Sequence, residues 1–114
     1  MEINIIISKN YEYPDLSNIS NEVLEQKFSL TKEELVFVNK VKEKYNRLGF
    51  AVLLKIFSYL GYFVNDLSKV PLNIVSMLAA QLDLDVESIR RYNKLNSVKG
   101  YHISLIKRYY GIST

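Results

Sequence analysis

Residues 48–64 limit what this chain can fold into more than any other segment does. The run is apolar on most sides of a helix and is interrupted by Lys55, Ser58 and Gly61, which leaves it too short and too polar to cross a membrane. A helix without a wide polar face must be buried among other elements of a globular domain. We therefore predict a helix over about residues 47–62 at the centre of the hydrophobic core.

Capping residues and a proline place further helices on both sides of this central one. Thr31 and Glu34 form a capping box, which predicts a helix from Thr31 to about residue 45. The buried face of that helix would carry Leu35, Val38 and Val41. Pro71 suits the start of a helix over about residues 72–82.

Shorter signals describe the N-terminal part of the chain. Asn18 or Ser20 can cap a short helix that runs to residue 28. Residues 3–7 form an apolar run that is either an edge strand or a loosely docked arm, and Tyr13-Pro14-Asp15 turns the chain after it. We therefore predict one compact all-α domain of five to six helices over residues 1–114, with residues 1–17 as an extended or loosely ordered arm.

The composition excludes several kinds of site. The 114 residues contain no cysteine and one histidine, which rules out disulfides and thiolate ligands and argues against zinc. The chain has no glycine-rich phosphate loop and no nucleophile elbow, and Asp83 and Asp85 are explained as a turn residue and a helix cap. We expect no catalytic residue, cofactor, metal or membrane span. The N-terminus lacks a basic region before its apolar run, so we expect no secretory signal and a cytoplasmic location.

The net charge of +3 is distributed unevenly along the chain. Residues 88–114 hold six basic and no acidic side chains, whereas residues 1–87 hold nine basic and twelve acidic ones. Four tyrosines are interleaved with these basic residues, namely Tyr92, Tyr101, Tyr109 and Tyr110. Basic and aromatic side chains gathered in this way are typical of a surface that binds the phosphate backbone of nucleic acid. The alternative is a solvated helix face.

Residues 76–94 have the pattern of a helix-turn-helix. Such a pair needs a small residue where the helices cross, a residue tolerant of left-handed geometry at the turn, and apolar anchors in the second helix. Ala79 supplies the small residue and Asp83 the turn, where glycine is more usual. The apolar anchors would be Leu84, Ile89 and Tyr92. Asp85 is placed to cap the second helix.

The second helix of this pair would span about residues 86–94 and present a basic face to the outside. With Ile89 and Tyr92 turned inward, the outward residues are Glu87, Arg90, Arg91 and Lys94. Arginine at such positions either bonds guanine O6 and N7 in the major groove or pairs with phosphate. Helix pairs of this form also occur in helical proteins that do not bind DNA, so the pattern alone leaves both interpretations open.

Several blocks of this sequence resemble the N-terminal domain of Tn3-family transposases. Residues 45–54 resemble the block H-N-R-L-G-F-A-x-Q-L, and residues 57–63 resemble R-F-L-G-x-F. Val70-Pro71 followed by residues 78–82 resembles V-P … L-A-x-Q-L. The tail of the family, R-Y … H … I-R … Y-G, is matched by Arg91-Tyr92, His102, Ile106-Lys107 and Tyr110-Gly111. The resemblance covers about residues 28–114.

The resemblance implies a DNA-binding domain that recognises the terminal inverted repeats of a transposon. Such a domain positions the catalytic domain at the transposon end, and the Asp-Asp-Glu catalytic residues of the family lie in a later domain that this chain does not contain. The implied partners are double-stranded DNA, the remainder of the transposase and other transposase copies. The alternatives are a helical module for transposase assembly, with an exposed apolar face over residues 53–63, and a stand-alone repressor at transposon ends.

Residues 46–49 allow a structural and a functional interpretation. Either Asn46 caps the central helix and Arg47 pairs with an acid such as Glu43, or both side chains reach DNA from the N-terminus of that helix. Gly49 is expected to permit close helix packing.

The last part of the chain is expected to hold the DNA backbone. Lys99 and Lys107 stand where the resembled family has arginine. His102 matches the histidine of the family and is expected to make a structural hydrogen bond or a phosphate contact. Tyr109 and Tyr110 are candidates for sugar or base contacts. The full set of predicted DNA-binding residues is Asn46, Arg47, Glu87, Arg90, Arg91, Lys94, Lys99, His102, Lys107 and Arg108.

Overall fold

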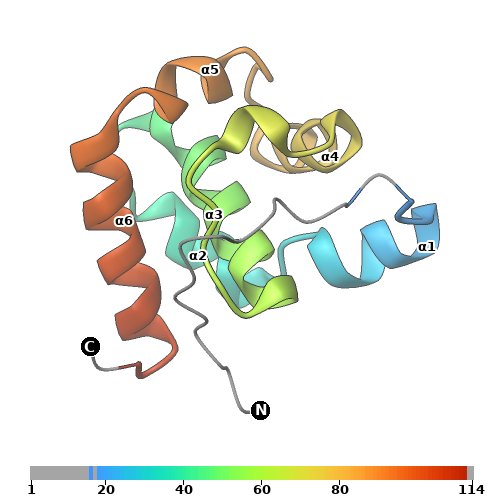
Figure 1. Cartoon of the computed structure of the whole chain (residues 1–114), viewed down its shortest axis with the longest axis horizontal. Coiled ribbons are helices and arrows are strands. Elements are labelled where there is room, and N and C mark those ends of the chain that lie inside the picture. Colours follow the sequence, from blue (N-terminus) through green and yellow to red (C-terminus); the bar gives the residue numbers. More distant parts are fainter. Residues whose placement is uncertain (1–15, 17, 113–114) are drawn as a thin grey trace.

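The computed structural model describes Leu16 and residues 18–112, and every regular element in that part of the chain is helical (Figure 1). The elements in chain order are α1 (Asn21–Val23), the π-helix η1 (Leu24–Phe28), α2 (Lys32–Asn39), the 3-10 helix η2 (Lys44–Asn46), α3 (Arg47–Leu60), the 3-10 helix η3 (Leu67–Lys69), α4 (Leu72–Leu82), α5 (Ser88–Asn93) and α6 (Asn96–Tyr109). The prediction of an all-α fold is confirmed. The predicted arm lies outside the described residues, apart from Leu16.

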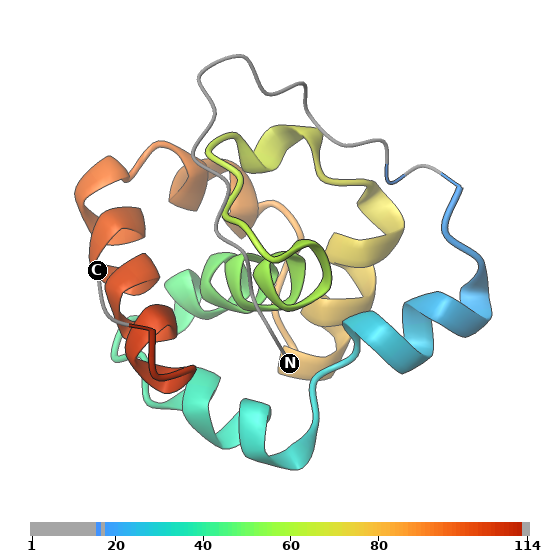
Figure 2. The ribbon, with the colours of Figure 1, turned by 60° about the horizontal axis from the view of Figure 1, so that its bottom comes forward.

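Helix α3 lies at the centre of the domain, with the other helices arranged around it (Figure 2). All residues from 48 to 57 are buried, including the charged Lys55. The helix ends at Leu60 because Gly61 adopts the left-handed conformation, with φ of 83°, and its N–H bonds to the carbonyl of Phe57. The prediction of a buried central helix is therefore confirmed, with its C-terminal end two residues earlier.

The predicted caps form at the start of two helices. The Thr31 side chain accepts a hydrogen bond from the Glu34 N–H at 3.1 Å, and Glu34 Oε1 accepts one from the Thr31 N–H at 2.9 Å. Ser20, one of the two cap candidates near the N-terminus, accepts from the N–H of Val23 at 3.2 Å. Pro71 directly precedes α4, whose bounds agree with the prediction.

Helix α2 ends earlier than we predicted. It stops at Asn39 instead of continuing to about residue 45, and its last turn tightens through i to i+3 bonds from Lys40 to Phe37 and from Val41 to Val38. Val41 is nevertheless buried. The apolar contact expected of Val41 is thus made from a turn, and residues 42–46 are free to cross toward α5.

Glu34 also forms the buried ion pair of the core. Lys55 Nζ donates to both carboxylate oxygens of Glu34, at 2.8 and 3.1 Å, and both residues are buried. One carboxylate therefore caps α2 and neutralises the lysine of α3. Removing either partner would leave a buried charge without compensation.

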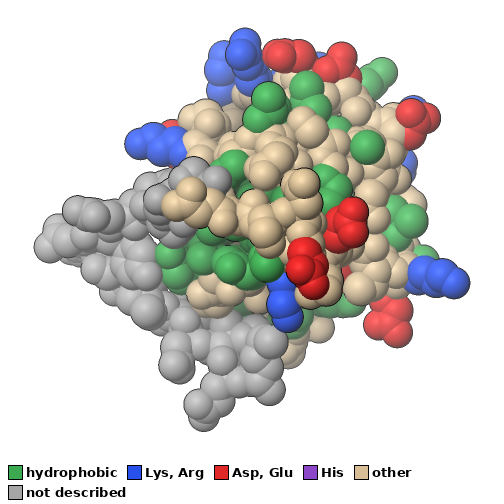
Figure 3. All heavy atoms as spheres, turned by 90° about the vertical axis from the view of Figure 1, so that its right-hand side faces the viewer, with side chains coloured by type: hydrophobic (Ala, Val, Ile, Leu, Met, Phe, Trp, Pro, Cys, Tyr) green, Lys and Arg blue, Asp and Glu red, His purple; other side chains and the backbone are tan. Residues whose placement is uncertain are grey.

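The distribution of charge and the character of the helices both bear on where a binding site could lie. Basic and acidic side chains are interspersed on the side of the molecule that lies to the right in Figure 1, where α1 and α4 are found (Figure 3). Within the described residues, no helix combines the length and the apolar character needed to cross a membrane. Helix α5 lies at the top of Figure 1.

Candidate nucleic-acid interface

Helices α4 and α5 follow one another through a tight turn, as the predicted helix-turn-helix pattern requires. Ala79 is buried, and its carbonyl accepts from the N–H of Leu84 at 2.9 Å. Asp83 adopts the left-handed conformation, with φ of 55° and ψ of 49°, and is the one residue other than glycine with positive φ in the described chain. The bond between Leu84 and Ala79, together with the left-handed Asp83, closes α4 with a Schellman-type turn. Aspartate thus fills the role that glycine usually has.

Asp85 caps the chain just before α5. Its Oδ1 accepts from the N–H of Glu87 at 2.9 Å, and its carbonyl accepts from the Ser88 hydroxyl at 2.8 Å. Residues 86 and 87 form a turn, so α5 spans only Ser88–Asn93 and is shorter than the predicted helix. The reason is that the bonds at residues 88 to 90 reach back three residues, as in a 3-10 turn.

Tyr92 fixes α5 to the core. It is fully buried, and a Cβ atom on Gly49 of α3 would lie 2.0 Å from Cδ2 of the Tyr92 ring. The Tyr92 hydroxyl and Nδ1 of His102 on α6 share a hydrogen bond of 2.7 Å. The His102 ring packs in turn against Phe50, with ring centroids 4.8 Å apart. This contact of Gly49, Tyr92 and His102, which we call the anchor, joins α3, α5 and α6.

Burial keeps the anchor neutral. Desolvation lowers the pKa of His102 and raises the pKa of Tyr92. Both side chains are therefore uncharged at neutral pH. The expected structural hydrogen bond of His102 is present, because the ring is buried and bonded to Tyr92. This burial gives no support to the alternative of a phosphate contact.

Helix α5 and the residues at its two ends carry exposed charged side chains, as the helical spacing predicts. Arg90 and Arg91 on the helix are exposed, and so are Glu87 and Lys94, which flank it. The guanidinium Nε of Arg90 lies 3.4 Å from Glu87 Oε2, in a pair whose side chains are 79% and 65% exposed. An ion pair this exposed holds its partners weakly. The cations of α5 are therefore available to an anionic ligand.

The C-terminal end of α5 is tied to the loop before α4. Asn93 Oδ1 accepts from the N–H of Leu67 at 2.8 Å, and Asn93 Nδ2 donates to Asp66 Oδ1 at 2.9 Å. The Ser68 hydroxyl and the Asn93 amide hold the pKa of Asp66 down at about 2. Lys99 Nζ donates to the carbonyl of Asn65 at 3.0 Å and to Asn93 Oδ1 at 3.3 Å.

This network changes the role of Lys99. Sequence patterns assigned Lys99 to the DNA backbone, but the structure places its ammonium group against the loop at residues 65 and 66, where it is half-buried. Its charge helps to hold α5 and α6 together. The lysine is a positioning residue in this structure, so the prediction of a DNA contact is not supported.

The remaining basic residues of the tail lie at the far end of α6. Helix α6 has 14 residues and is therefore about 21 Å long, with Lys107 and Arg108 in its last turn. Beside them Tyr109 stacks on Phe37 of α2, with ring centroids 4.3 Å apart. The structure thus divides the predicted basic region into two parts and does not bring Lys107 and Arg108 next to α5.

The structural interpretation expected Asn46 to cap α3 and Arg47 to pair with an acid such as Glu43, and neither interaction is present among the described residues. Asn46 is the residue before α3, but its side chain makes no capping hydrogen bond. Arg47 Nε donates to the carbonyl of Val41 at 2.9 Å, and no ion pair with Glu43 forms. Both side chains are half-buried. Arg47 therefore holds the turn of residues 41–46, which packs against α5 through η2.

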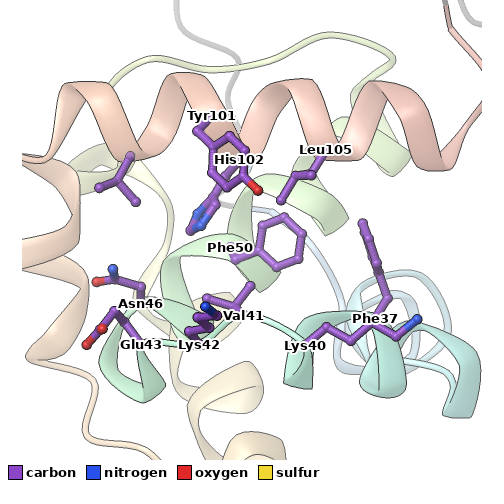
Figure 4. Close-up of a pocket in the computed structure, with 11 residues that line it drawn as sticks. Phe37, Lys40, Val41, Lys42, Glu43, Asn46, Phe50, Tyr101, His102 and Leu105 are labelled. Atoms are coloured by element: carbon purple, nitrogen blue, oxygen red, sulfur yellow. The ribbon is translucent and has the colours of Figure 1, made fainter.

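A pocket of about 540 Å³ lies between this turn and α6 (Figure 4). Figure 4 shows Tyr101, His102 and Leu105 of α6 facing Phe37, Val41 and Phe50. Lys40 and Lys42 border it on the side of the turn. No group of three or more histidine, cysteine or acidic side chains suited to a metal ion occurs in the described part of the chain.

Fold and surface together define a small all-α domain in which a short helix with exposed cations, α5, follows α4 through a left-handed turn. Sequence comparison identifies the particular family. This chain belongs to the family described as "Domain of unknown function (DUF4158)", whose profile matches residues 8–114. No solved structure matches the chain.

Its relatives are transposases of the Tn3 family, as the sequence resemblance predicts. The chain is 36% identical over 85 residues to the transposase for transposon gamma-delta of Escherichia coli (strain K12), 28% over 87 residues to that for Tn1546 of Enterococcus faecium, and 32% over 85 residues to that for Tn2501 of Escherichia coli. These matches cover 74%, 76% and 74% of this chain but 8%, 9% and 8% of the relatives. The chain thus spans less than a tenth of the length of the curated relatives it matches.

Proposed function

We propose that this chain is the N-terminal DNA-binding domain of a Tn3-family transposase and that α5 docks in or against the major groove of the terminal inverted repeat. The observation that carries the proposal is the anchoring of α5. A buried tyrosine and the Asn93 network fix the helix, while Arg90, Arg91 and Lys94 remain exposed. Groove-reading side chains need such a rigid support.

Each exposed residue of α5 has a defined chemical role in this proposal. Arg90 and Arg91 are suited to bidentate bonds with guanine or to phosphate contacts, Lys94 to phosphate, and Glu87 to accepting from the cytosine amino group. The exposed pair of Arg90 with Glu87 opens at low cost. The described residues of this helix therefore offer both base-reading and backbone-binding groups.

Catalysis is assigned to the remainder of the transposase in this proposal. The domain would position that part at the transposon end by binding DNA, and further transposase copies would bind the partner end. The alternative of an assembly module needed an exposed apolar face over residues 53–63. Leu53, Ile56 and Phe57 of that face are buried, so the structure does not favour this alternative.

A binding titration tests the proposal. The chain is titrated against a labelled duplex of the terminal inverted repeat of its own element and against a duplex of the same bases in scrambled order, at two salt concentrations. We expect a preference for the repeat that persists at the higher salt, because base contacts do not depend on counterion release. Equal and steeply salt-dependent binding to both duplexes would contradict sequence recognition by this domain.

The double variant Arg90→Ala/Arg91→Ala tests the role of α5. Both side chains are exposed, so we expect an unchanged melting temperature together with loss of the preference for the repeat. Wild-type preference in this folded variant would show that another surface reads the DNA.

A further inference from the structure

The turn between α2 and α3 carries basic side chains that the sequence patterns did not assign to DNA. Lys42 and Lys44 are exposed, and Tyr45 has 64% of its surface exposed despite its size. Exposed tyrosines beside lysines are common where a protein contacts the sugar-phosphate backbone. Only the acid Glu43 interrupts this cluster.

This turn lies directly beside the helix proposed to read DNA. The 3-10 helix η2 packs against both α5 and the start of α3, and Figure 1 shows the beginning of α3 close to α5 and the start of α6. The backbone of η2 thus lies beside α5, although the two segments are distant in sequence. The exposed basic residues of the two segments and their flanks are Lys42, Lys44, Arg90, Arg91 and Lys94, and the exposed acidic residues are Glu43 and Glu87.

Internal hydrogen bonds hold the turn in place. Arg47 Nε bonds to the carbonyl of Val41 at 2.9 Å, the N–H of Asn46 bonds to the carbonyl of Glu43 at 2.9 Å, and the N–H of Arg47 bonds to the carbonyl of Lys44. Val41 itself is buried in the core. The backbone that carries the two lysines is therefore already fixed before a ligand binds. Binding does not have to bear the entropic cost of ordering this turn.

We propose that residues 42–45 form a second DNA contact beside α5, an inference that rests on the proposed function. Lys42 and Lys44 bind phosphates of the strand that borders the groove, and Tyr45 packs against the sugar of the same backbone. These contacts do not distinguish base sequences. The turn therefore supplies affinity and orientation, and α5 supplies the preference for the repeat.

The salt dependence of binding gives the expected magnitude. Each phosphate contact contributes about 0.9 to the slope of log affinity against log salt, so removing two lowers the slope by about 1.8. Raising the salt from 50 to 200 mM weakens the binding of both proteins. Because of the slope difference, the factor by which affinity falls should be about 12-fold smaller for the variant than for the wild type. The preference for the repeat over the scrambled duplex should remain.

The experiment compares two double variants that remove the same charge. Lys42→Gln/Lys44→Gln tests the turn, and Lys27→Gln/Lys32→Gln is the matched control, because its exposed lysines lie on η1 and α2, outside both the turn and α5. Both are titrated on the repeat and the scrambled duplex from 50 to 200 mM salt, with Arg90→Ala/Arg91→Ala measured in parallel. Thermal melting monitored by circular dichroism confirms that all variants fold.

The outcomes separate this inference from the function on which it rests. A reduced slope on both duplexes for Lys42→Gln/Lys44→Gln, with the control close to wild type, supports the second contact. If the two lysine variants show the same slope of log affinity against log salt, the second contact is overturned. The proposed function still stands in that case, provided that the wild type binds and the arginine variant loses its preference for the repeat. Absence of binding by the wild type overturns both proposals. As an independent check, Tyr45→Ala should weaken binding to both duplexes by a similar factor.

Discussion

Replacing Gly49 by alanine tests how closely α5 packs on the central helix. The added Cβ would lie 2.0, 2.1 and 2.4 Å from three atoms of the Tyr92 ring, so the ring must move by more than about 1 Å to restore ordinary contact. Tyr92 is fully buried and cannot turn into solvent without leaving the core. Overpacking of this kind costs about 1–3 kcal/mol.

The same movement strains the hydrogen bond between Tyr92 and His102. That bond is 2.7 Å long and buried, and leaving its groups without partners costs about 1–3 kcal/mol more. We therefore expect Gly49→Ala to lower the free energy of unfolding by about 2–6 kcal/mol. In a domain of this size the melting temperature should fall by roughly 10 °C or more.

Urea unfolding and thermal melting measure this loss, and Gly100→Ala is the matched control. Gly100 lies within α6, is exposed, and has no atom within 4 Å of the position of an added Cβ. Alanine there should stabilise the helix by about 1 kcal/mol. The same substitution is thus expected to destabilise the domain at Gly49 and to stabilise it at Gly100.

A wild-type urea midpoint for Gly49→Ala would refute the described packing. A double-mutant cycle locates the cause more closely: if the clash involves the Tyr92 ring, Gly49→Ala should cost much less in a Tyr92→Leu background than in the wild type. Additive costs would show that Gly49 is needed for another reason.

Three further predictions concern stability. Because burial lowers the pKa of His102, folding should be most stable above the ordinary histidine pKa of about 6.5 and lose stability as the pH falls toward the lowered value; unfolding by urea from pH 7.5 to 5 should show this, and His102→Gln should flatten the profile. Glu34→Gln leaves the buried Lys55 without its counter-charge and should cost about 3–5 kcal/mol in urea unfolding, so wild-type stability would contradict the buried pair. Asp83→Gly should be neutral or stabilising by up to about 1 kcal/mol, since glycine adopts the left-handed conformation at φ 55° without steric cost; a clear destabilisation in thermal melts would contradict this.

Local signals predicted the parts of the fold that depend on neighbouring residues. The capping box at Thr31, the helix start after Pro71 and the left-handed turn at Asp83 each follow from side-chain chemistry within four residues. The buried helix α3 follows from an apolar pattern that leaves no polar face. Tertiary contacts reinforce these elements without changing them.

Features that depend on distant partners were not predictable from one sequence. Val41 is buried whether or not helix α2 continues, so its apolar character could not show that the chain turns at Lys40. Lys99 looks like any basic residue of the tail until the carbonyl of Asn65, 34 positions away, is placed beside it. His102 likewise depends on Tyr92 for its partner.

The candidate surface was predicted in part for the same reason. Arg90, Arg91 and Lys94 follow from helical spacing around Tyr92 and are exposed as expected. The turn that carries Lys42 and Lys44 lies near them only because η2 packs against α5. Charge counted along the sequence placed Lys107 and Arg108 with the same group, although the length of α6 separates them in space.

The shortness of α5 has a consequence for how DNA binding could be observed. A helix of six residues does not form by itself in water, so this surface exists only while the domain is folded. In the proposed complex, DNA binds only the folded state of the chain and therefore stabilises it by mass action. The free energy of unfolding rises by about 2.7 kcal/mol when the DNA concentration is a hundred times the dissociation constant. The melting temperature of the domain would then act as a gauge of how much of it is bound to DNA.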